Sequence, residues 1–104
     1  SFSITVLTLL EDLGFCKKGE GGAWVSGGRL RFDNPNGPAL NTDGGGLSSN
    51  HPGMRGIFLL IEAARQLRGE STSQVKDARL AVAHGNGGML GSRHSAGTII
   101  LGRD

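Results

Sequence analysis

The stretch Asn41-Thr-Asp-Gly-Gly-Gly-Leu-Ser-Ser-Asn-His-Pro-Gly-Met-Arg-Gly56 decides the fold. It is typical of a strand end, a glycine turn and a helix that begins beside a histidine. Proline suits the first position of a helix, because its missing N–H group would be unpaired there in any case. The pattern therefore places His51 at the start of a helix. Histidine caps helices poorly compared with Ser or Asn, so Ser49 or Asn50 is the better cap and His51 is available for another role.

The segments after this stretch alternate between helix and strand. Residues 53–68 are predicted to be helical, with Arg65 and Arg68 favouring the negative end of the helix dipole and Gly69 capping it. The apolar stripe of this helix consists of Ile57, Leu60, Ile61, Ala64 and Leu67. After a polar connection, residues 78–84 are predicted to form a strand that ends at His84, and residues 98–101 a buried strand.

The segments before the stretch are less regular. Residues 2–13 have helical spacing of apolar side chains, although their first residues also alternate as in a strand; we expect a helix that ends at Gly14. Residues 16–38 look irregular, and a hairpin of residues 23–26 and 29–32 is one interpretation. Residues 34–38 are typical of a turn, and residues 39–42 are expected to form a short strand. This order predicts an α/β fold, a mixed β-sheet with packed helices.

Composition limits the classes of function. The 104 residues fit a single domain or a fragment, and the first residue is Ser rather than Met, which suggests processing or a piece of a longer protein. The net charge is only +2 and no basic block occurs, so no nucleic-acid partner is expected. No apolar run approaches the roughly 18 residues of a membrane span. The single cysteine, Cys16, fits a reducing compartment, and we expect a cytoplasmic location.

Two histidines are the candidate catalytic residues. The positive end of a helix dipole keeps His51 neutral, so it can accept a proton or donate a hydrogen bond to an oxyanion. His84 is expected beside a glycine turn whose backbone N–H groups would bind an oxyanion. The predicted binding residues are Gly44, Gly45, Gly46, Asn50, Gly85, Asn86, Gly87 and Gly88. For each histidine, a structural role beside a turn is the alternative.

Other chemistries lack their residues. The glycine-rich segments carry neither a phosphate-loop lysine nor the dinucleotide-binding spacing. The histidines lack metal-ligand spacing and a cysteine pair, so no metal is expected. Cys16 follows a helix instead of beginning one, so nothing lowers its pKa and it is not an evident nucleophile. Arg55, one turn from His51, is placed to meet an anionic group. The sequence therefore indicates half of an active site.

These residues resemble the thiolases, and among them the sterol-carrier or lipid-transfer type. Thiolases carry an Asn-x-x-Gly-Gly block followed by Gly-His-Pro-x-Gly-x-x-Gly, and residues 41–56 are similar to it, with Asn50 in place of the glycine before His-Pro. The segment from His84 to Gly88 stands where thiolases have a Cys-x-Gly block. The first helix is similar to the one after the family's Asn-Glu-Ala-Phe or His-Asp-Cys-Phe motif, of which Phe2 is the last residue.

The resemblance implies a C-terminal portion of a thiolase-like domain, about the last quarter of a longer parent chain. The family's nucleophilic cysteine would lie in that parent, so these 104 residues alone would be inactive. His51 would activate the nucleophile and bind the thioester oxygen of a coenzyme A thioester, with no bound cofactor, and His84 would take the place of the cysteine that exchanges the substrate α-proton. A histidine there departs from degradative thiolases. It leaves open an acetyl-CoA acetyltransferase-like acyltransferase, an aldolase acting on steroid-type side chains, a non-catalytic lipid or acyl-CoA binding protein, and a fragment that only packs. The parent would be a homodimer, with a small acyl-CoA-binding subunit as a further partner.

Overall fold

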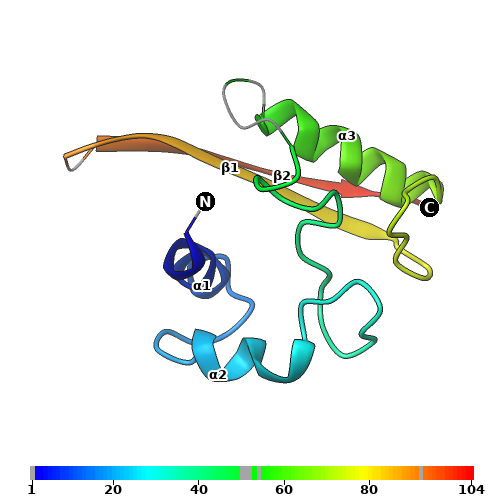
Figure 1. Cartoon of the computed structure of the whole chain (residues 1–104), viewed down its shortest axis with the longest axis horizontal. Coiled ribbons are helices and arrows are strands. Elements are labelled where there is room, and N and C mark those ends of the chain that lie inside the picture. The colour runs from blue at the N-terminus through cyan, green and yellow to red at the C-terminus, as the bar shows by residue number, and fades with distance from the viewer. Residues whose placement is uncertain (1, 50–52, 54, 92) are drawn as a thin grey trace. The chain divides into compact units, whose positions relative to one another are not determined.

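The computed structural model describes residues 2–49, 53, 55–91 and 93–104 (Figure 1). The chain divides into two compact units, Ser1–Leu40 and Asn41–Asp104. The first unit contains α1 (Ser3–Asp12), α2 (Gly21–Val25) and the short 3-10 helix η1 (Ser26–Gly28). The second contains α3 (Arg55–Arg68), β1 (Leu80–Leu90) and β2 (Arg93–Gly102). The α/β class predicted from the sequence is confirmed, and so is a helix packed against the sheet.

The first helix ends as its glycine predicts. Gly14 has φ +84°, a left-handed conformation that side chains disfavour. Its N–H group donates to the carbonyl of Glu11 at 3.1 Å, and Phe15 N–H donates to Leu10 at 3.0 Å. These two bonds form a Schellman motif, which satisfies carbonyl groups that the helix end would leave unpaired. The helix expected over residues 2–13 is therefore confirmed, and the alternative strand is not formed.

The hairpin interpretation of residues 23–32 is wrong, because α2 and η1 occupy this region. The cause is a contact from outside the segment. The Glu11 side chain accepts the Gly21 N–H at 2.9 Å, which supplies a partner for the start of α2. A β-carbon on Gly21 would lie 2.8 Å from the Glu11 Oε1 atom, so a side chain here would force the Glu11 carboxylate to shift. Trp24 then packs against Phe15, with ring centroids 6.2 Å apart.

The short strand expected at residues 39–42 is not formed either. Asn41 has φ +48°, a left-handed conformation outside the range of β-strands. Thr42 instead begins a turn, and its side chain is hydrogen-bonded to Glu62. The turn expected just before, at residues 34–38, is confirmed, because Asn36 N–H donates to the Asn34 side chain at 2.9 Å.

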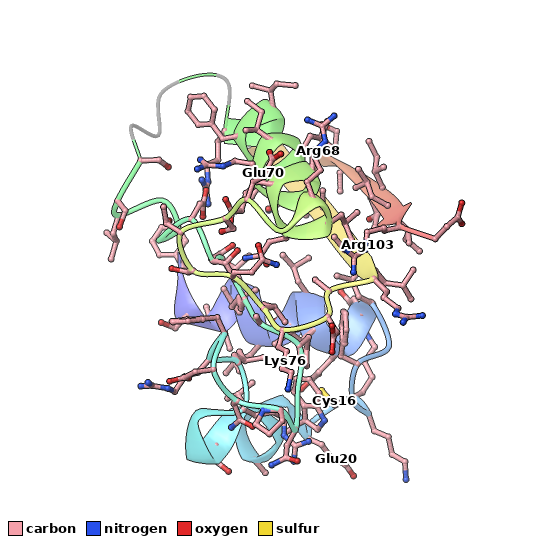
Figure 2. The ribbon with its side chains drawn as sticks, turned by 90° about the vertical axis from the view of Figure 1, so that its right-hand side faces the viewer. Cys16, Glu20, Arg68, Glu70, Lys76 and Arg103 are labelled. Carbon is pink, nitrogen blue, oxygen red and sulfur yellow. The ribbon has the colours of Figure 1, made fainter. Side chains whose placement is uncertain are left out.

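The second unit is built on α3, which begins within two residues of its expected start and ends where predicted. Gly69 has φ +75°, its N–H donates to Gln66 at 3.2 Å, and Glu70 N–H donates to Arg65 at 2.8 Å, a second Schellman motif. Arg68 and Glu70, on either side of this cap, are labelled in Figure 2. No helix in the described part of the chain is long and apolar enough to cross a membrane.

The buried face of α3 differs from the predicted stripe. Leu67 is buried as predicted, but the other buried residues are Ala63 and Gln66, whereas Ile57 and Ile61 of the predicted stripe are exposed. Gln66 escaped prediction because it is polar. Its side chain is satisfied by the Ser73 carbonyl at 2.8 Å and the Val75 N–H at 2.9 Å, which removes the cost of burying it.

The sheet of the described residues is an antiparallel hairpin of β1 and β2. Both strands are longer than expected, so the glycine segment from Gly85 to Gly88 lies within β1 and not in a turn. The hydrogen bonds of a ladder join backbone groups and need no side chain. The ladder therefore continues through the pairs Gly85–Gly97, Asn86–Ala96 and Gly87–Ser95. The strand expected to be buried is open to solvent, because Ile99 and Ile100 are 51% and 70% exposed.

Candidate functional site

His84 lies in the middle of β1, directly opposite Thr98 of β2. The expectation that it ends a strand is wrong, because the ladder runs on for six more residues of β1, to Leu90. Residues opposite each other in an antiparallel pair have side chains on the same face and in contact. The His84 Nδ1 atom accordingly lies 2.8 Å from the Thr98 hydroxyl oxygen. The ring's other nitrogen, Nε2, is buried and has no hydrogen-bond partner among the residues that the structure describes.

His84 projects from the face of the hairpin opposite the one that α3 covers. Side chains alternate between the two faces of a strand. Ala83 is only 8% exposed, whereas its neighbour Val82 is 44% exposed. Since α3 packs against β1, Ala83 lies on the helix side and His84 lies on the other face of the strand, together with Val82. The imidazole is therefore held by its neighbour strand instead of by the helix.

The glycine segment after His84 is a stretch of backbone without side chains. A β-carbon on Gly85, Gly87 or Gly97 would meet no described atom within 4 Å. At Gly88 the ladder shifts: Gly87 pairs with Ser95 and Leu90 with Arg93, so β1 carries one extra residue, a β-bulge. Gly88 has φ +66°, the conformation that such a bulge requires of glycine. In an extended strand, successive N–H groups point to opposite sides, so they do not converge as they would in the expected turn.

The glycines of the first predicted loop are held by the loop itself. Gly44 has φ +93°, and a β-carbon there would lie 2.4 Å from the Ser48 hydroxyl oxygen, so no side chain fits. The Asp43 carboxylate accepts the Gly45 N–H at 3.0 Å. The Ser49 hydroxyl donates to the Gly45 carbonyl at 3.2 Å. These hydrogen bonds between residues of the same loop hold its conformation.

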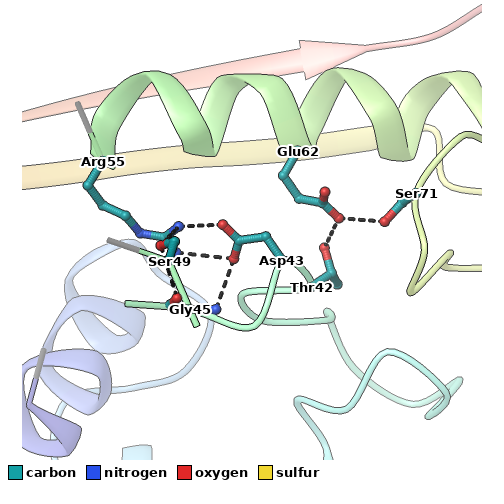
Figure 3. A network of polar contacts seen from close by, with 7 residues as sticks. All are labelled: Thr42, Asp43, Gly45, Ser49, Arg55, Glu62 and Ser71. Atoms are coloured by element: carbon teal, nitrogen blue, oxygen red, sulfur yellow. Dashed lines mark hydrogen bonds and ion pairs between the residues drawn. The ribbon is translucent and has the colours of Figure 1, made fainter. Parts of the chain in front are cut away.

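An ion pair joins this loop to the first turn of α3 (Figure 3). Arg55 donates from both terminal nitrogens to both carboxylate oxygens of Asp43, with one contact at 3.1 Å, and also to the Ser49 hydroxyl at 3.0 Å. Both charged side chains retain only 17% of their exposure. The hydrogen bonds from Arg55 lower the pKa of Asp43, against the opposing effect of burial. Arg55 therefore meets an anionic group as predicted, but that group belongs to this chain.

A second cluster fastens the same helix to the segments on either side of it. The Oε1 atom of Glu62 accepts hydroxyl bonds from Thr42 and Ser71, both at 2.6 Å, and an amide bond from Gln66 at 3.2 Å (Figure 3). Burial by itself raises the pKa of Glu62, but the three donated bonds outweigh it and the net pKa is lowered. Glu62 is therefore a charged anchor on α3.

The predicted residues Asn50 and His51 lie outside the described residues, so their part in the site stays a prediction. What the structure gives is the start of α3 beyond them. Its 14 residues span about 21 Å, the length of about six residues of an extended strand. Because α3 runs along β1 from the beginning of that strand (Figure 1), the N-terminal end of the helix is level with the middle of β1, where His84 lies.

Cys16 has the surroundings of an unreactive thiol. It lies in the segment between α1 and α2, with Glu20 in the same segment (Figure 2). Burial raises its pKa, and the nearby charges of Glu11 and Glu20 raise it further. A thiol with a raised pKa is protonated near neutral pH and is a poor nucleophile. Within the described ranges, no group of three or more His, Cys, Asp or Glu side chains is placed to hold a metal ion.

Sequence reasoning missed Thr98, Asp43 and Glu62. Thr98 is found only through the register of the hairpin, which pairs it with a residue 14 positions away. Asp43 had a local signal, because an aspartate two residues before a glycine often accepts that residue's N–H in a turn. Glu62 gave no signal, since it looks like any charged residue on the polar side of a helix.

Comparison with known proteins places these features in a family. The model of thiolase C-terminal domain-like proteins matches residues 1–103. An acetyl-CoA acetyltransferase of Methanocaldococcus jannaschii is 35% identical over 101 residues, covering 96% of this chain and 25% of that protein. Sterol carrier protein 2 of Rattus norvegicus is 40% identical over 90 residues, 83% of this chain and 16% of the relative.

A third relative carries a different activity in its name. The steroid side-chain-cleaving aldolase of Thermomonospora curvata is 39% identical over 77 residues, 73% of this chain and 18% of that protein. The chain thus spans about a quarter or less of the length of the curated relatives that it matches.

Proposed function

Because the chain belongs to the thiolase C-terminal domain-like family, we propose that it supplies the C-terminal part of an acyltransferase that makes or breaks carbon–carbon bonds on coenzyme A thioesters. The observation that carries the proposal is the match of the family over nearly the whole chain, together with a relative named acetyl-CoA acetyltransferase that aligns over 96% of it. The resemblance found in the sequence, centred on residues 41–56, supports the same conclusion.

In this proposal the two histidines divide the acid–base chemistry. His51, four residues before Arg55 in the sequence, is the base that activates a nucleophile and donates a hydrogen bond to the thioester oxygen. His84 is the second acid–base group and exchanges the α-proton of the substrate. Gly44–Gly46 and Gly85–Gly88, with Asn50 and Asn86, line the path of the acyl chain. The bare backbone around Gly85 supports this, since a β-carbon at Gly85 or Gly87 would meet no described atom within 4 Å and a substrate could lie against the strand there.

The nucleophile is supplied by residues outside this chain. Cys16 is the only cysteine among the 104 residues, and its raised pKa opposes thiolate formation. We therefore propose that the 104 residues by themselves turn over no thioester, because a general base cannot replace a missing nucleophile. The remainder of the proposed machinery is a longer cytoplasmic parent chain, in a homodimer, with a small acyl-CoA-binding subunit as a candidate partner. No bound cofactor is needed, since coenzyme A enters as part of the substrate.

An aldolase acting on steroid-type side chains is the second candidate. His84 stands where the thiolases that this chain resembles have a cysteine, and this difference favours the aldolase. The relative named as a steroid side-chain-cleaving aldolase favours it as well. Both reactions make or break a bond next to a thioester carbonyl and need an acid–base group there. A non-catalytic lipid or acyl-CoA binding protein is the third, supported by the name of the sterol carrier relative.

One set of assays on the complete gene product that contains residues 1–104 separates the three. Thiolysis of acetoacetyl-CoA, cleavage of a β-hydroxy steroid-type acyl-CoA, and calorimetric binding of acetyl-CoA are measured for the unchanged protein and for His51→Ala, His84→Ala and His94→Ala. His94 is an exposed residue of β2 and serves as the control. Loss of thiolysis in the first two variants alone supports the acyltransferase. Cleavage without thiolysis favours the aldolase, and binding that survives both changes without turnover favours the carrier. Failure to bind any thioester refutes the proposal.

A further inference from the structure

The structure assigns Thr98 a role beyond packing: we propose that it is a positioning residue that holds the His84 ring in one orientation and in one tautomer, with the proton on Nδ1 and a free lone pair on Nε2. The geometric part stands on the hairpin alone. The catalytic part rests on the proposed function, because it gives the lone pair a substrate.

The geometry of the pair restrains the imidazole. His84 and Thr98 are directly opposite in the register, and the Nδ1 atom and the hydroxyl oxygen are 2.8 Å apart. On the same face, the next pair along the ladder is Val82 with Ile100, and on the other side it is Asn86 with Ala96. A β-branched residue such as threonine has few side-chain rotamers. Its hydroxyl group is therefore a well-fixed partner for one nitrogen of the ring.

Burial then decides which nitrogen carries the proton. A hydroxyl group can donate or accept, so the bond alone allows both neutral tautomers. If Thr98 donated to Nδ1, the proton would lie on Nε2, and a buried N–H donor would have no partner among the described residues. If Nδ1–H donates to Thr98, the buried atom is a lone pair, and the hydroxyl hydrogen of the exposed Thr98 reaches water. Orphaned buried donors are rarer than under-satisfied acceptors, so the second arrangement is favoured.

This tautomer makes His84 a base. Because Nε2 is buried in this chain, a substrate reaches it only when the atoms that cover it move aside. The Nε2 lone pair then accepts a proton from the α-carbon of the substrate, and the electron pair of the broken C–H bond passes to the thioester carbonyl as an enolate. The ring becomes an imidazolium, and its Nδ1–H bond to Thr98 is kept throughout. The opposite tautomer would present an N–H group, which polarises a carbonyl but cannot take a proton. Thr98 thus selects between the two roles open to a neutral histidine.

The direct test is the tautomer itself. The complete gene product is labelled with 15N-histidine, and the nitrogen signals of His84 are identified by their loss in His84→Gln. For the neutral form of the ring we expect a protonated Nδ1 and an unprotonated Nε2 in the unchanged protein. We expect the same pattern in Thr98→Ser, which keeps the hydroxyl, and a mixture of tautomers in Thr98→Val, which has nearly the same shape without it. A protonated Nε2 in the unchanged protein overturns the inference, even if the valine variant fails to fold.

Kinetics test the consequence. Thr98→Val should lower kcat about three- to tenfold with little change in KM, the range that loss of one neutral hydrogen bond produces, and Thr98→Ser should restore most of it. Ser95→Ala, which removes another exposed hydroxyl of β2, is the matched control and should leave kcat unchanged. If kcat depends on His84 but Thr98→Val alters neither kcat nor the tautomer, the inference fails and the proposed function stands. If the tautomer is as expected but His84→Ala keeps full turnover, the catalytic role of His84 in the proposed function fails and the positioning role of Thr98 stands.

Discussion

Replacing Arg55 with methionine should loosen the loop of residues 41–49, which contains Gly44, Gly45 and Gly46. Methionine keeps much of the length and apolar surface of arginine but removes the charge and all its donors. The loss comprises the two-pronged contact with Asp43 and the bond to Ser49. It leaves the Asp43 carboxylate partly buried and without its cation. The Gly45 N–H bond to Asp43 then becomes the main remaining restraint on that side chain.

The expected size follows from burial. Truncating one partner of a fully buried ion pair costs about 3–5 kcal/mol, whereas exposed pairs contribute about 0–1 kcal/mol. With 17% of each side chain still exposed, the Arg55–Asp43 pair lies between these limits, and we expect a cost of about 2 kcal/mol. At 1.4 kcal/mol per tenfold, local opening of the loop should become about thirtyfold more frequent.

Hydrogen exchange followed by mass spectrometry measures that opening directly. Peptides covering residues 41–49 of the complete gene product should exchange about thirtyfold faster in Arg55→Met, since exchange of a protected amide reports the free energy of local opening. Arg31→Met is the matched control. Arg31 makes the same two-pronged contact with Asp33, at 2.8 and 2.7 Å, but the two side chains are 68% and 50% exposed. It should leave exchange over residues 28–37 nearly unchanged. Equal effects of the two substitutions would refute the argument from burial.

The further predictions concern pH and two glycines, Gly56 within α3 and Gly69 directly after it. Arg55 lowers the folded-state pKa of Asp43 below its ordinary value of 3.8. The stabilisation that the ion pair gives is therefore complete above pH 3.8 and is lost as the pH falls through the folded-state pKa. Hydrogen exchange over residues 41–49 should accelerate in that acid range, and Asp43→Asn should remove most of this pH dependence. Gly56→Ala should stabilise the protein by about 0.5–1 kcal/mol, because Gly56 is helical and its β-carbon would meet no described atom. Gly69→Ala should instead destabilise it by about 1 kcal/mol, because Gly69 has φ +75°; both are measured by thermal unfolding, and a shift of the same sign in both would contradict the reasoning.

The sequence predicted the two longer helices well because their signals are local. Apolar spacing marks α1 and α3, and a glycine within two residues of the last helical residue marks the end of each. α2 was missed because its start depends on Glu11, ten positions before Gly21. The strands were predicted too short for a similar reason. Glycine argues against a strand by its own preference, but at Gly85 the opposing Gly97 sustains the pairing.

The candidate site shows the same division. His84 could be singled out as a polar residue beside glycines, yet its partner Thr98 is set by a register that a slip of one residue would reverse. The ion pair of Asp43 with Arg55 closes a loop of 12 positions, and neither residue signals the other in the sequence. Residue types therefore nominated the chemistry, while the contacts that orient it came from long-range geometry.

The long hairpin also has a consequence for self-association of the chain. In the part of the chain that the structure describes, the sheet has two strands, so each strand is bonded along one side only. The outer edges of β1 and of β2 present backbone N–H and C=O groups that can form hydrogen bonds with another extended segment. A two-stranded hairpin is at best marginally stable in water, so added strands are favoured. In a concentrated preparation the nearest such segment is the hairpin of another molecule. We therefore expect these 104 residues to self-associate by strand pairing at the outer edges of β1 and β2.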